Sequence, residues 1–497
     1  MIPEIYTSII PLLAVLVSLA AVPLILFSSK YKNLRESWTI IAALIKFGLV
    51  LSLLPGALAG KTAECSMFDI FPGIKLALRA DPFGVFFALI ASGLWIFTSF
   101  YSIGYVRGAP EKKQTRYFAS FAVCLSATIG IAFSANLLSF IIFYEILTIA
   151  TYPLVIHKET KKAIDAGRKY LVYTITAGLF LIAAAAWTYK LTGTLDFKAG
   201  GLFADGVLNP QTAVALFFLF LGGVGVKAGI MPMHSWLPTA MAAPTPVSAL
   251  LHAVAVVKSG VFGVVRVVGF VFGPALMAQF GLNTILLIFA GVTIIVASLI
   301  ALRQDNLKRR LAYSTIGHLS YIVLGAALLT ESGFAGGMMH IAFHATMKIT
   351  LFFVAGAIYV NLHKENISDM NGIGKVMPWT MGAFTIGAIG LAGIPPINGF
   401  VSKWYLGLGS LEAGTLIPLG ILVISGILNA AYFFPIVYIA FFKKGKGLEG
   451  KGEAPLAMVI PLVITAILSL LLGIYPDLFF KFYRMAVDIA GTILGGG

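Results

Sequence analysis

Charged residues and cysteines are both scarce in this sequence of 497 residues. Only 11% of the residues are charged, against roughly a quarter in an average soluble domain, whereas 59% are hydrophobic. A soluble globule does not need so much apolar surface, so the composition excludes a cytosolic enzyme, a nucleic-acid binder and a disordered chain. Because a transmembrane helix needs about 20 apolar residues, the chain could form on the order of fourteen spans. The composition predicts an all-α polytopic membrane protein.

The two cysteines, Cys65 and Cys124, form no CxxC motif. They exclude a disulfide framework and a structural zinc site. The sequence also contains no Walker loop, iron–sulfur cysteine set or haem-attachment motif, so we expect no cofactor and no redox or nucleotide chemistry in this chain. Residues 5–29 carry no charge and are too long for the apolar part of a signal peptide, which predicts a first span there.

Charge-free stretches and loop signals predict the boundaries of about fourteen helices. The predicted spans are 4–27, 38–59, 82–106, 117–133, 136–156, 168–189, 210–238, 246–271, 279–302, 311–329, 334–361, 377–411, 415–442 and 455–475. Residues 477–494 are amphipathic and too charged to cross, so we expect them to lie along the outer interface of the membrane. The segment 60–80, with Pro72 and Gly73, is expected to be an outer loop that can hold a short hairpin.

The net charge of +15 reflects basic residues in alternate loops. With the N-terminus outside, the cytoplasmic loops carry 22 lysines and arginines, and the opposite loops and the tail carry 7. This asymmetry fixes the orientation by the positive-inside rule. We therefore expect a multi-pass protein of the cell membrane with both termini on the outer side.

A weak internal repeat relates two parts of the chain. SANLLSFIIFYEIL at 134–147 resembles QDNLKRRLAYSTIG at 304–317, and KAGIMP at 227–232 resembles LAGIPP at 391–396. Five predicted helices separate the copies, an odd number, so the copies must be inverted across the membrane, as in many transporters. We expect four parts: helices 1–3 in 1–116, a first five-helix repeat in 117–271, a second in 272–442, and the last helix with an amphipathic tail in 443–497.

Six basic residues fall inside the predicted spans, and one acidic residue lies near the centre of a span. Each charge at the middle of the bilayer costs roughly 2.5–3.5 kcal/mol, so such groups persist where they are paired, hydrated or partly neutral, and useful. Two of the basic residues, Lys46 and Arg266, lie nearer to helix ends. Snorkelling of the charged head to the membrane surface explains their positions at least as well as a function does. For the acidic residue, the alternative is a salt bridge that only holds two helices together. The two near helix ends are Lys46 and Arg266, and the others are Glu145, Lys227, Lys258, Lys348 and Lys403.

Two of these lysines lie beside prolines that predict broken helices. Pro232 cannot donate to the carbonyl four residues earlier, so the seventh helix should break just past Lys227. Pro395 and Pro396 likewise predict a break in the twelfth helix, two turns before Lys403. Carbonyls released at membrane depth are tolerable only where they face protein or water. Hydrated pockets are therefore expected at both lysines.

His340, His344 and Lys348 are spaced i, i+4, i+8, so they share one face of a helix. A zinc site is the obvious competitor, but no glutamate follows His340 and no third ligand is near. The spacing therefore favours a proton-conducting or hydrated stripe, and no metal is expected.

His252 and His318 are the remaining candidates inside the spans. His252 lies six residues before Lys258, and His318 lies alone in the middle of a helix, where core packing is the alternative. Histidine exchanges a proton near neutral pH, and desolvation brings buried lysine toward that range. Together, the lysines and histidines would form a proton relay.

Four motifs resemble one family over nearly the entire chain. They are FYEILTIATYPL, GVKAGIMPMHSWLPTAMAAPTPVSALLHAVAVVKSGVF, RRLAYSTIGHLSY and PPINGFVSKWY. They are similar to the antiporter-like subunits shared by respiratory complex I, Mrp-type Na⁺/H⁺ antiporters and membrane-bound hydrogenases. Within that family, the length of the chain is most similar to the D-type member of Mrp or to its counterpart in a membrane-bound hydrogenase.

The resemblance implies fourteen helices, two inverted five-helix repeats and breaks in helices seven and twelve. It implies that Glu145 and Lys227 form the glutamate–lysine pair of helices five and seven, that Lys258 is the central lysine, and that Lys403 is the residue of helix twelve. It places four histidines on the central polar axis: His252, His318, His340 and His344.

The sequence thus predicts a proton-translocating subunit, without catalytic chemistry of its own, inside a larger membrane complex. The expected partners are other membrane subunits, protons and the lipid bilayer, and not nucleic acid. The alternatives are Na⁺ movement in a Na⁺/H⁺ antiporter and, less in keeping with the residues, a stand-alone transporter of an organic solute. Sodium prefers several oxygen ligands, whereas the predicted axis offers mainly lysine and histidine.

Overall fold

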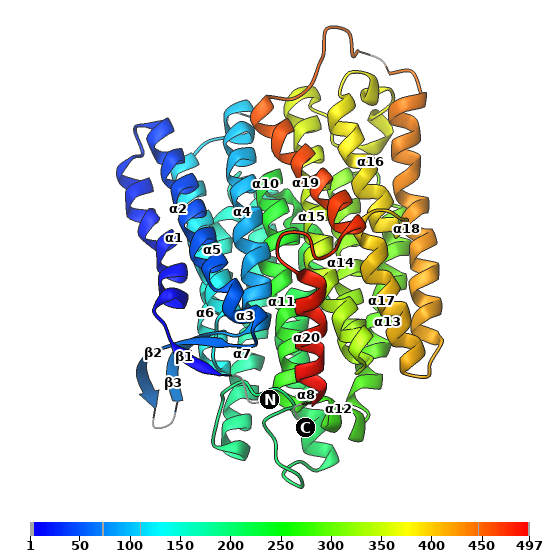
Figure 1. The fold of residues 1–497 in the computed structure, drawn as a ribbon. Helices are drawn as coiled ribbons and strands as arrows, with labels where there is room; N and C mark the ends of the chain where they lie inside the picture. Colours follow the sequence, from blue (N-terminus) through cyan, green and yellow to red (C-terminus); the bar gives the residue numbers. More distant parts are fainter. Residues whose placement is uncertain (1–3, 72–73, 110, 446, 496–497) are drawn as a thin grey trace.

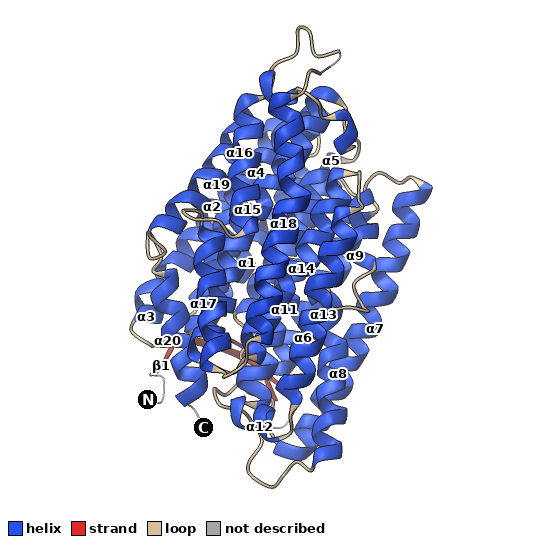
Figure 2. Ribbon diagram, turned by 90° about the vertical axis from the view of Figure 1, so that its right-hand side faces the viewer, coloured by secondary structure: helices blue, strands red, loops and turns tan. Residues whose placement is uncertain are grey.

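The computed structural model describes residues 4–71, 74–109, 111–445 and 447–495. The helices run roughly side by side in one elongated bundle, and the strands lie near one end of it (Figure 2). Both ends of the described chain lie at that same end, opposite the loop that joins α18 to α19 (Figure 1).

The helices follow the predicted spans closely. The first group is α1 (Ile10–Phe27), α2 (Lys32–Ser52), α3 (Leu54–Leu58), α4 (Pro82–Gly108), α5 (Gln114–Ala132), α6 (Leu137–Val155), α7 (Lys161–Thr192) and α8 (Pro210–Ala228). The second is α9 (Trp236–Thr239), α10 (Thr245–Ala249), α11 (Val256–Arg266), α12 (Pro274–Gln279), α13 (Leu282–Leu302), α14 (Leu307–Ala327) and α15 (Glu331–Leu362). The third is α16 (Pro378–Ala392), α17 (Asn398–Glu412), α18 (Ile417–Phe442), α19 (Leu456–Ile474) and α20 (Phe482–Gly495).

Within the described residues, twelve helices are long and apolar enough to cross a membrane. The tenth and twelfth predicted spans are not among the twelve, although helices occupy both. The tenth span, α14, begins with Lys308, Arg309 and Arg310 and contains further polar residues, which lower its mean hydropathy. In the twelfth, the break leaves α16 and α17 with 15 residues each. The helical membrane fold is confirmed, with one small sheet beside the helices, and the count of fourteen crossings and the four-part division stay predictions.

Three predicted helix starts were wrong by six or seven residues: α2 begins at Lys32 instead of residue 38, and the other two have a clear local reason. Helix α1 begins at Ile10 instead of residue 4, because the strand Ile5–Thr7 pairs with another strand before the helix starts. Helix α7 begins at Lys161 instead of residue 168. The hydroxyl of Thr160 accepts from the backbone N–H of Ala163 at 3.2 Å, and this cap carries the helix into the basic loop.

The segment 60–80 forms the expected hairpin, within a small three-stranded sheet of order β1-β2-β3. Strand β1 (Ile5–Thr7) is parallel to β2 (Thr62–Phe71), and β2 is antiparallel to β3 (Ile74–Ala80). The predicted turn at Pro72 and Gly73 lies outside the described residues.

The centre of the bundle consists of two helices with no lipid-facing side. One is the continuous helix Thr245–Phe272, and the other is α15; the most apolar window of each is wholly buried. The first contains two π-helical segments, η2 (Leu250–Val254) and η3 (Val267–Phe272), on either side of Lys258. Such segments are frequent at functional sites.

The amphipathic tail does not lie along a membrane interface as expected. Helix α20 runs beside the bundle helices and packs against α15, α4 and η3 (Figure 1). Its buried side chains include Phe482, Met485, Ile489 and Ile493. The tail is therefore part of the bundle, because its apolar face finds a protein surface.

Arg266 and Lys46 do not snorkel, which corrects the interpretation from their places near helix ends. Arg266 is 2% exposed and donates to both carboxylate oxygens of Asp81 at 2.6 and 2.7 Å. Four aromatic rings surround its guanidinium at 4.5–5.2 Å. Lys46 is fully buried, donates to the Ser18 hydroxyl at 2.5 Å and lies 5.2 Å from the ring of Trp95.

We expect Arg266→Met to destabilise the bundle. It leaves the Asp81 carboxylate partly buried without its cation, and breaking a buried pair costs about 3–5 kcal/mol. Thermal unfolding of the purified protein measures the loss. The matched control is Arg168→Met, because Arg168 and Asp165 form an exposed pair worth about 0–1 kcal/mol. Equal effects of the two substitutions would show that the Arg266 pair has no structural role.

Candidate functional site

Five of the predicted site residues lie on the two central helices. The helix Thr245–Phe272 carries His252 and Lys258, and α15 carries His340, His344 and Lys348. All five are fully buried. The structure therefore brings the predicted candidates to the centre of the bundle.

Lys258 and His344 join the two central helices directly. The amine of Lys258 lies 2.8 Å from Nδ1 of His344. The other ring nitrogen of His344, Nε2, is buried and has no hydrogen-bond partner. A proton on Lys258 therefore has a neutral acceptor within hydrogen-bond reach, on the neighbouring helix.

His318 belongs to the same cluster and is not an isolated packing residue. Its Nδ1 lies 3.1 Å from Nε2 of His340, and Nδ1 of His340 lies 2.8 Å from the hydroxyl of Ser402. The ring centres of His318, His340 and His344 are 5.3–5.7 Å apart. Ser402 was not predicted, and it comes from α17, beyond the second helix break.

Lys348 begins a second branch of the network. Its amine donates to the hydroxyl of Ser314 at 2.8 Å, and Ser314 lies 3.0 Å from the hydroxyl of Tyr432. Tyr432 in turn donates to the amide oxygen of Asn429. The amide nitrogen of Asn429 lies 3.2 Å from Nε2 of His318, so the two branches meet there. Ser314, Tyr432 and Asn429 were also missed by sequence reasoning.

The second helix break lies where the prolines predicted it, and Lys403 caps it, a contact that was not predicted. Helix α16 ends at Ala392, and the amine of Lys403 donates to the released carbonyls of Leu391 and Ala392 at 2.8 and 3.0 Å. The amide nitrogen of Asn429 donates to the same Leu391 carbonyl at 3.0 Å. Lys403 thus contacts the histidine network through one shared carbonyl.

The first break also lies where it was predicted. Helix α8 ends at Ala228, and Gly229 follows with φ +71°, a left-handed conformation that glycine adopts without strain. The indole of Trp236 donates to the Val226 carbonyl at 2.8 Å, which satisfies one released group. Lys227 therefore lies fully buried at the last turn of this half-helix.

Glu145 and Lys227 interact electrostatically without forming a direct ion pair. The amine of Lys227 donates to the backbone carbonyl of Tyr144 at 2.6 Å and lies 3.3 Å from the centre of the Tyr144 ring. Glu145 Oε1 is buried without a hydrogen-bond partner. The carboxylate packs against Gly178 of α7, so closely that a Cβ there would lie 2.5 Å from Oε1.

His252 is separate from this hydrogen-bonded network. Neither of its ring nitrogens has a hydrogen-bond partner, and its ring packs against Phe352 with centres 4.8 Å apart. It does interact electrostatically with Lys348 and Lys308. His252 therefore lies between the central network and the basic end of the bundle.

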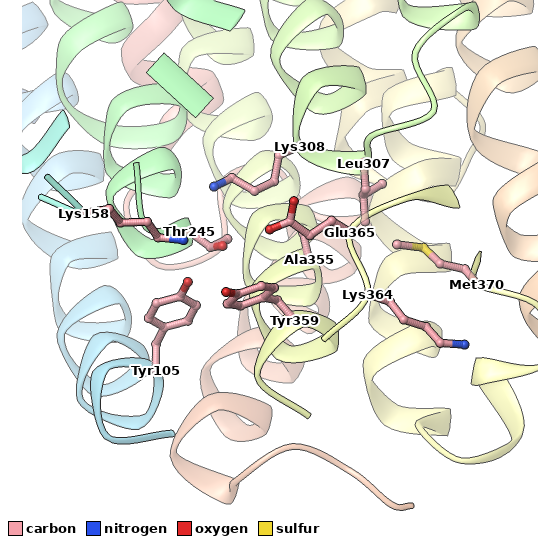
Figure 3. A pocket seen from close by; sticks show the side chains of 10 residues that line it. All are labelled: Tyr105, Lys158, Thr245, Leu307, Lys308, Ala355, Tyr359, Lys364, Glu365 and Met370. Carbon is pink, nitrogen blue, oxygen red and sulfur yellow. The ribbon is translucent and has the colours of Figure 1, made fainter. Parts of the chain in front are cut away.

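A pocket opens at that basic end (Figure 3). Lys308 and the carboxylate of Glu365 both point into it, and Lys308 donates to the Ala243 carbonyl at 2.6 Å. Nearby, burial raises the pKa of Glu111 above its usual value, although the charges of Lys158 and Lys308 oppose this. The pocket is lined by Tyr105, Lys158, Thr245, Leu307, Lys308, Ala355, Tyr359, Lys364, Glu365 and Met370.

The groups around the stacked histidines His318, His340 and His344 are hydrogen-bonding groups. Across the described ranges, no group of three or more histidine, cysteine, aspartate or glutamate side chains is placed to hold a metal ion. The neighbours of the three stacked histidines are amines, hydroxyls and an amide. This donor set suits the exchange of protons along hydrogen bonds.

Comparisons with known proteins agree with this architecture. Residues 134–429 match a family model described as NADH:quinone oxidoreductase/Mrp antiporter, transmembrane. The chain is 30% identical over 429 residues to NADH-quinone oxidoreductase subunit N of Desulforudis audaxviator, covering 82% of this chain and 83% of the relative. It is 30% identical over 422 residues to the D-type component of a Na⁺/H⁺ antiporter of Alkalihalophilus pseudofirmus, covering 83% of each.

Solved structures share the fold along almost the whole chain. A chain of the membrane-bound sulfane sulfur reductase, an archaeal respiratory membrane complex, superposes with a TM-score of 0.87 at 26% identity, covering 98% of this chain and 100% of that one. A chain of the Mrp complex from Dietzia sp. DQ12-45-1b superposes with a TM-score of 0.85 at 19% identity, covering 98% and 99%. The chain therefore belongs to the NADH:quinone oxidoreductase/Mrp antiporter transmembrane family, as an antiporter-like membrane subunit.

Proposed function

We propose that this chain conducts protons across the membrane along its buried polar axis, as one subunit of a larger energy-transducing complex. The complex is a membrane-bound hydrogenase or related ferredoxin-linked assembly, or an Mrp antiporter. The relatives named above include a subunit of an NADH-quinone oxidoreductase and one of a Na⁺/H⁺ antiporter, which supports a role beside other membrane subunits.

The observation that carries the proposal is the hydrogen-bonded network at the centre of the bundle. Lys258, Lys348 and Lys403 each have a neutral acceptor and no carboxylate as their hydrogen-bond partner. Because an unpaired charge at this depth costs about 2.5–3.5 kcal/mol, the three amines cannot all stay protonated cheaply. Protons held this way are readily exchanged between neighbours, which is what conduction requires.

The chemistry of the buried polar axis, which consists of Lys258, Lys348, Lys403 and the three stacked histidines with their partners, favours conduction of H⁺ over conduction of Na⁺. Hard cations are bound by several converging oxygen ligands. The groups that line this axis are amines and imidazoles joined by single hydroxyls. They can bind and release protons, but they repel a second cation.

The pocket at the basic end offers a place for proton uptake. Thr245 lines the pocket and His252 lies two turns further along the same helix; Tyr359 lines it and Lys348 lies three turns away on α15. The excess of basic residues in the loops at this end orients it toward the cytoplasm of a cell membrane, with both termini outside. His252 and Lys348 are then the first titratable groups that an incoming proton meets.

Glu145 is placed to regulate Lys227 at the edge of the bundle. Glu145 is only half-buried, and exposed apolar side chains of α7, including Ile175 and Leu179, lie on the neighbouring surface. A neighbouring membrane subunit seated there can draw the carboxylate away. Lys227 then loses its negative neighbour and releases its proton more easily, toward Lys258, the histidines and Lys403.

Glu145→Gln and Lys227→Ala should each abolish coupled proton transport while the complex still assembles. Both remove one charge of the interacting pair, and we expect a loss of at least ~10-fold, equivalent to ~1.4 kcal/mol. Proton uptake into inverted membrane vesicles measures it. Glu449→Gln and Lys451→Ala, in an exposed loop, are the controls. Normal pumping in both pair variants would rule the proposal out.

Gly178→Ala tests the position of the Glu145 carboxylate without changing its chemistry. The added methyl group must displace the end of a flexible side chain, so the amount of assembled complex should not change. Proton transport should fall several-fold, because the carboxylate moves relative to Lys227. The control is Gly382→Ala, where a Cβ meets nothing within 4 Å. If both variants transport like the wild type, the position of the Glu145 carboxylate does not matter.

Removal of sodium distinguishes the two ions. Because the axis holds protons and lacks clustered oxygen ligands, we expect proton uptake driven by the complex to persist in vesicles prepared without Na⁺. Restoring Na⁺ to the same vesicles is the control. Proton movement that depends strictly on Na⁺, and that Lys258→Met abolishes together with Na⁺ flux, would favour exchange through this chain.

A further inference from the structure

Asn429 occupies the junction of the network, and its orientation follows from one unambiguous contact. It is buried on α18, and one end of its amide lies 3.0 Å from the carbonyl oxygen of Leu391. A carbonyl can only accept a hydrogen bond, so this end is the NH₂ group. The opposite end is then the oxygen, and it accepts from the hydroxyl of Tyr432.

This orientation fixes which nitrogen of His318 carries the proton. The two hydrogens of this NH₂ group face three neighbours: the Leu391 carbonyl at 3.0 Å, Nε2 of His318 at 3.2 Å and the Tyr321 hydroxyl at 3.4 Å. The second hydrogen points to the nearer Nε2, where an N–H would face another donor, so neutral His318 is protonated on Nδ1. Nδ1–H then donates to Nε2 of His340 at 3.1 Å, which leaves His340 protonated on Nδ1 as well. Nδ1–H of His340 donates to Ser402, whose hydroxyl donates to the Gly399 carbonyl at 3.3 Å.

The donors on the other side of Asn429 are ordered in the same way. Lys348 donates to the oxygen of Ser314, and Tyr432 gives its single hydroxyl hydrogen to the oxygen of Asn429. Because that hydrogen is used, the contact of 3.0 Å between Tyr432 and Ser314 can be a hydrogen bond only with the Ser314 hydroxyl as donor. A series of hydrogen bonds thus runs from Lys348 to Gly399, and in each of them the donor can lie on the Lys348 side and the acceptor on the Gly399 side. Asn429 is the member of this line that cannot take up or release a proton near neutral pH, because it is a carboxamide.

We propose that Asn429 is a positioning residue that locks His318 and His340 in their Nδ1-protonated forms and prevents direct proton exchange between them and the Lys348 branch. This deepens the proposed proton function and rests on it. Protons from Lys348 must then travel by way of Lys258 and His344. Lys403 and Asn429 both donate to the Leu391 carbonyl, which orients the Asn429 amide. A movement of Lys403 therefore changes the hydrogen bonding of the carbonyl that holds Asn429 in this orientation.

The first test reads the tautomers directly in the purified complex. With ¹⁵N-labelled histidine, solid-state NMR distinguishes Nδ1–H from Nε2–H rings, and His318→Gln and His340→Gln assign the two signals by their loss. We expect both rings to be protonated on Nδ1 in the wild type. Either ring protonated on Nε2 overturns the proposal, and this readout needs no transport activity.

The second test uses Asn429→Asp and Asn429→Leu, with Asn361→Asp in an exposed hydrogen bond as the matched control. Both substitutions remove the donor to His318, so the Nδ1–H signals should shift to Nε2–H or become mixed, and proton transport should fall several-fold. Asn361→Asp should change neither. Unchanged tautomers in both Asn429 variants overturn the proposed role of Asn429, whereas normal pumping in both Glu145→Gln and Lys227→Ala would instead overturn the proposed function. If neither variant assembles, the tautomers of the wild type still decide.

Discussion

The rest of this structure depends on the hydrogen bonds that lysine side chains make away from water. Lys258, Lys348 and Lys403 lie inside the bundle, and their hydrogen-bond partners are an imidazole, a hydroxyl and backbone carbonyls. A carboxylate partner would stabilise each ammonium and hold its proton in place. Neutral acceptors satisfy the N–H groups of a lysine ammonium but stabilise its positive charge less than a carboxylate does. The same contacts that make burial of the lysine tolerable therefore also leave its proton exchangeable.

Arg266 shows the opposite solution within the same molecule. Its guanidinium has a fixed counter-ion, Asp81, and a cage of aromatic rings. Asp81 also accepts from the backbone N–H of Gly84 and so caps α4, which ties the pair to the start of a helix. Arginine paired with aspartate therefore suits a structural role, whereas lysine with neutral partners suits the proton exchange proposed above. The choice of arginine or lysine therefore distinguishes a structural position from a position suited to proton exchange.

Much of this arrangement could be predicted from the sequence, because charge and proline are conspicuous in apolar helices. Lys258, the i, i+4, i+8 spacing of His340, His344 and Lys348, and the breaks after Lys227 and before Lys403 all follow from rules of one helix. Ser314, Ser402, Asn429 and Tyr432 did not, because neutral polar residues are ordinary in membrane helices and acquire meaning only through contacts between helices. Arg266 and Lys46 were misjudged because distance from a helix end does not show what packs around it.

Each half of the chain contains a helix that is interrupted beside a lysine, but the two lysines have different hydrogen-bond partners. At the first break, Lys227 precedes the interruption and donates to a carbonyl of α6, the helix that carries Glu145. At the second, Lys403 follows the interruption and donates to the carbonyls that the break itself released. The first lysine therefore responds to an acid at the edge of the bundle, while the second is held by its own helix next to the histidines. Glu145 lies in the first half, and the three stacked histidines, His318, His340 and His344, lie in the second. The two ends of the axis are therefore chemically different, which a directional proton path requires.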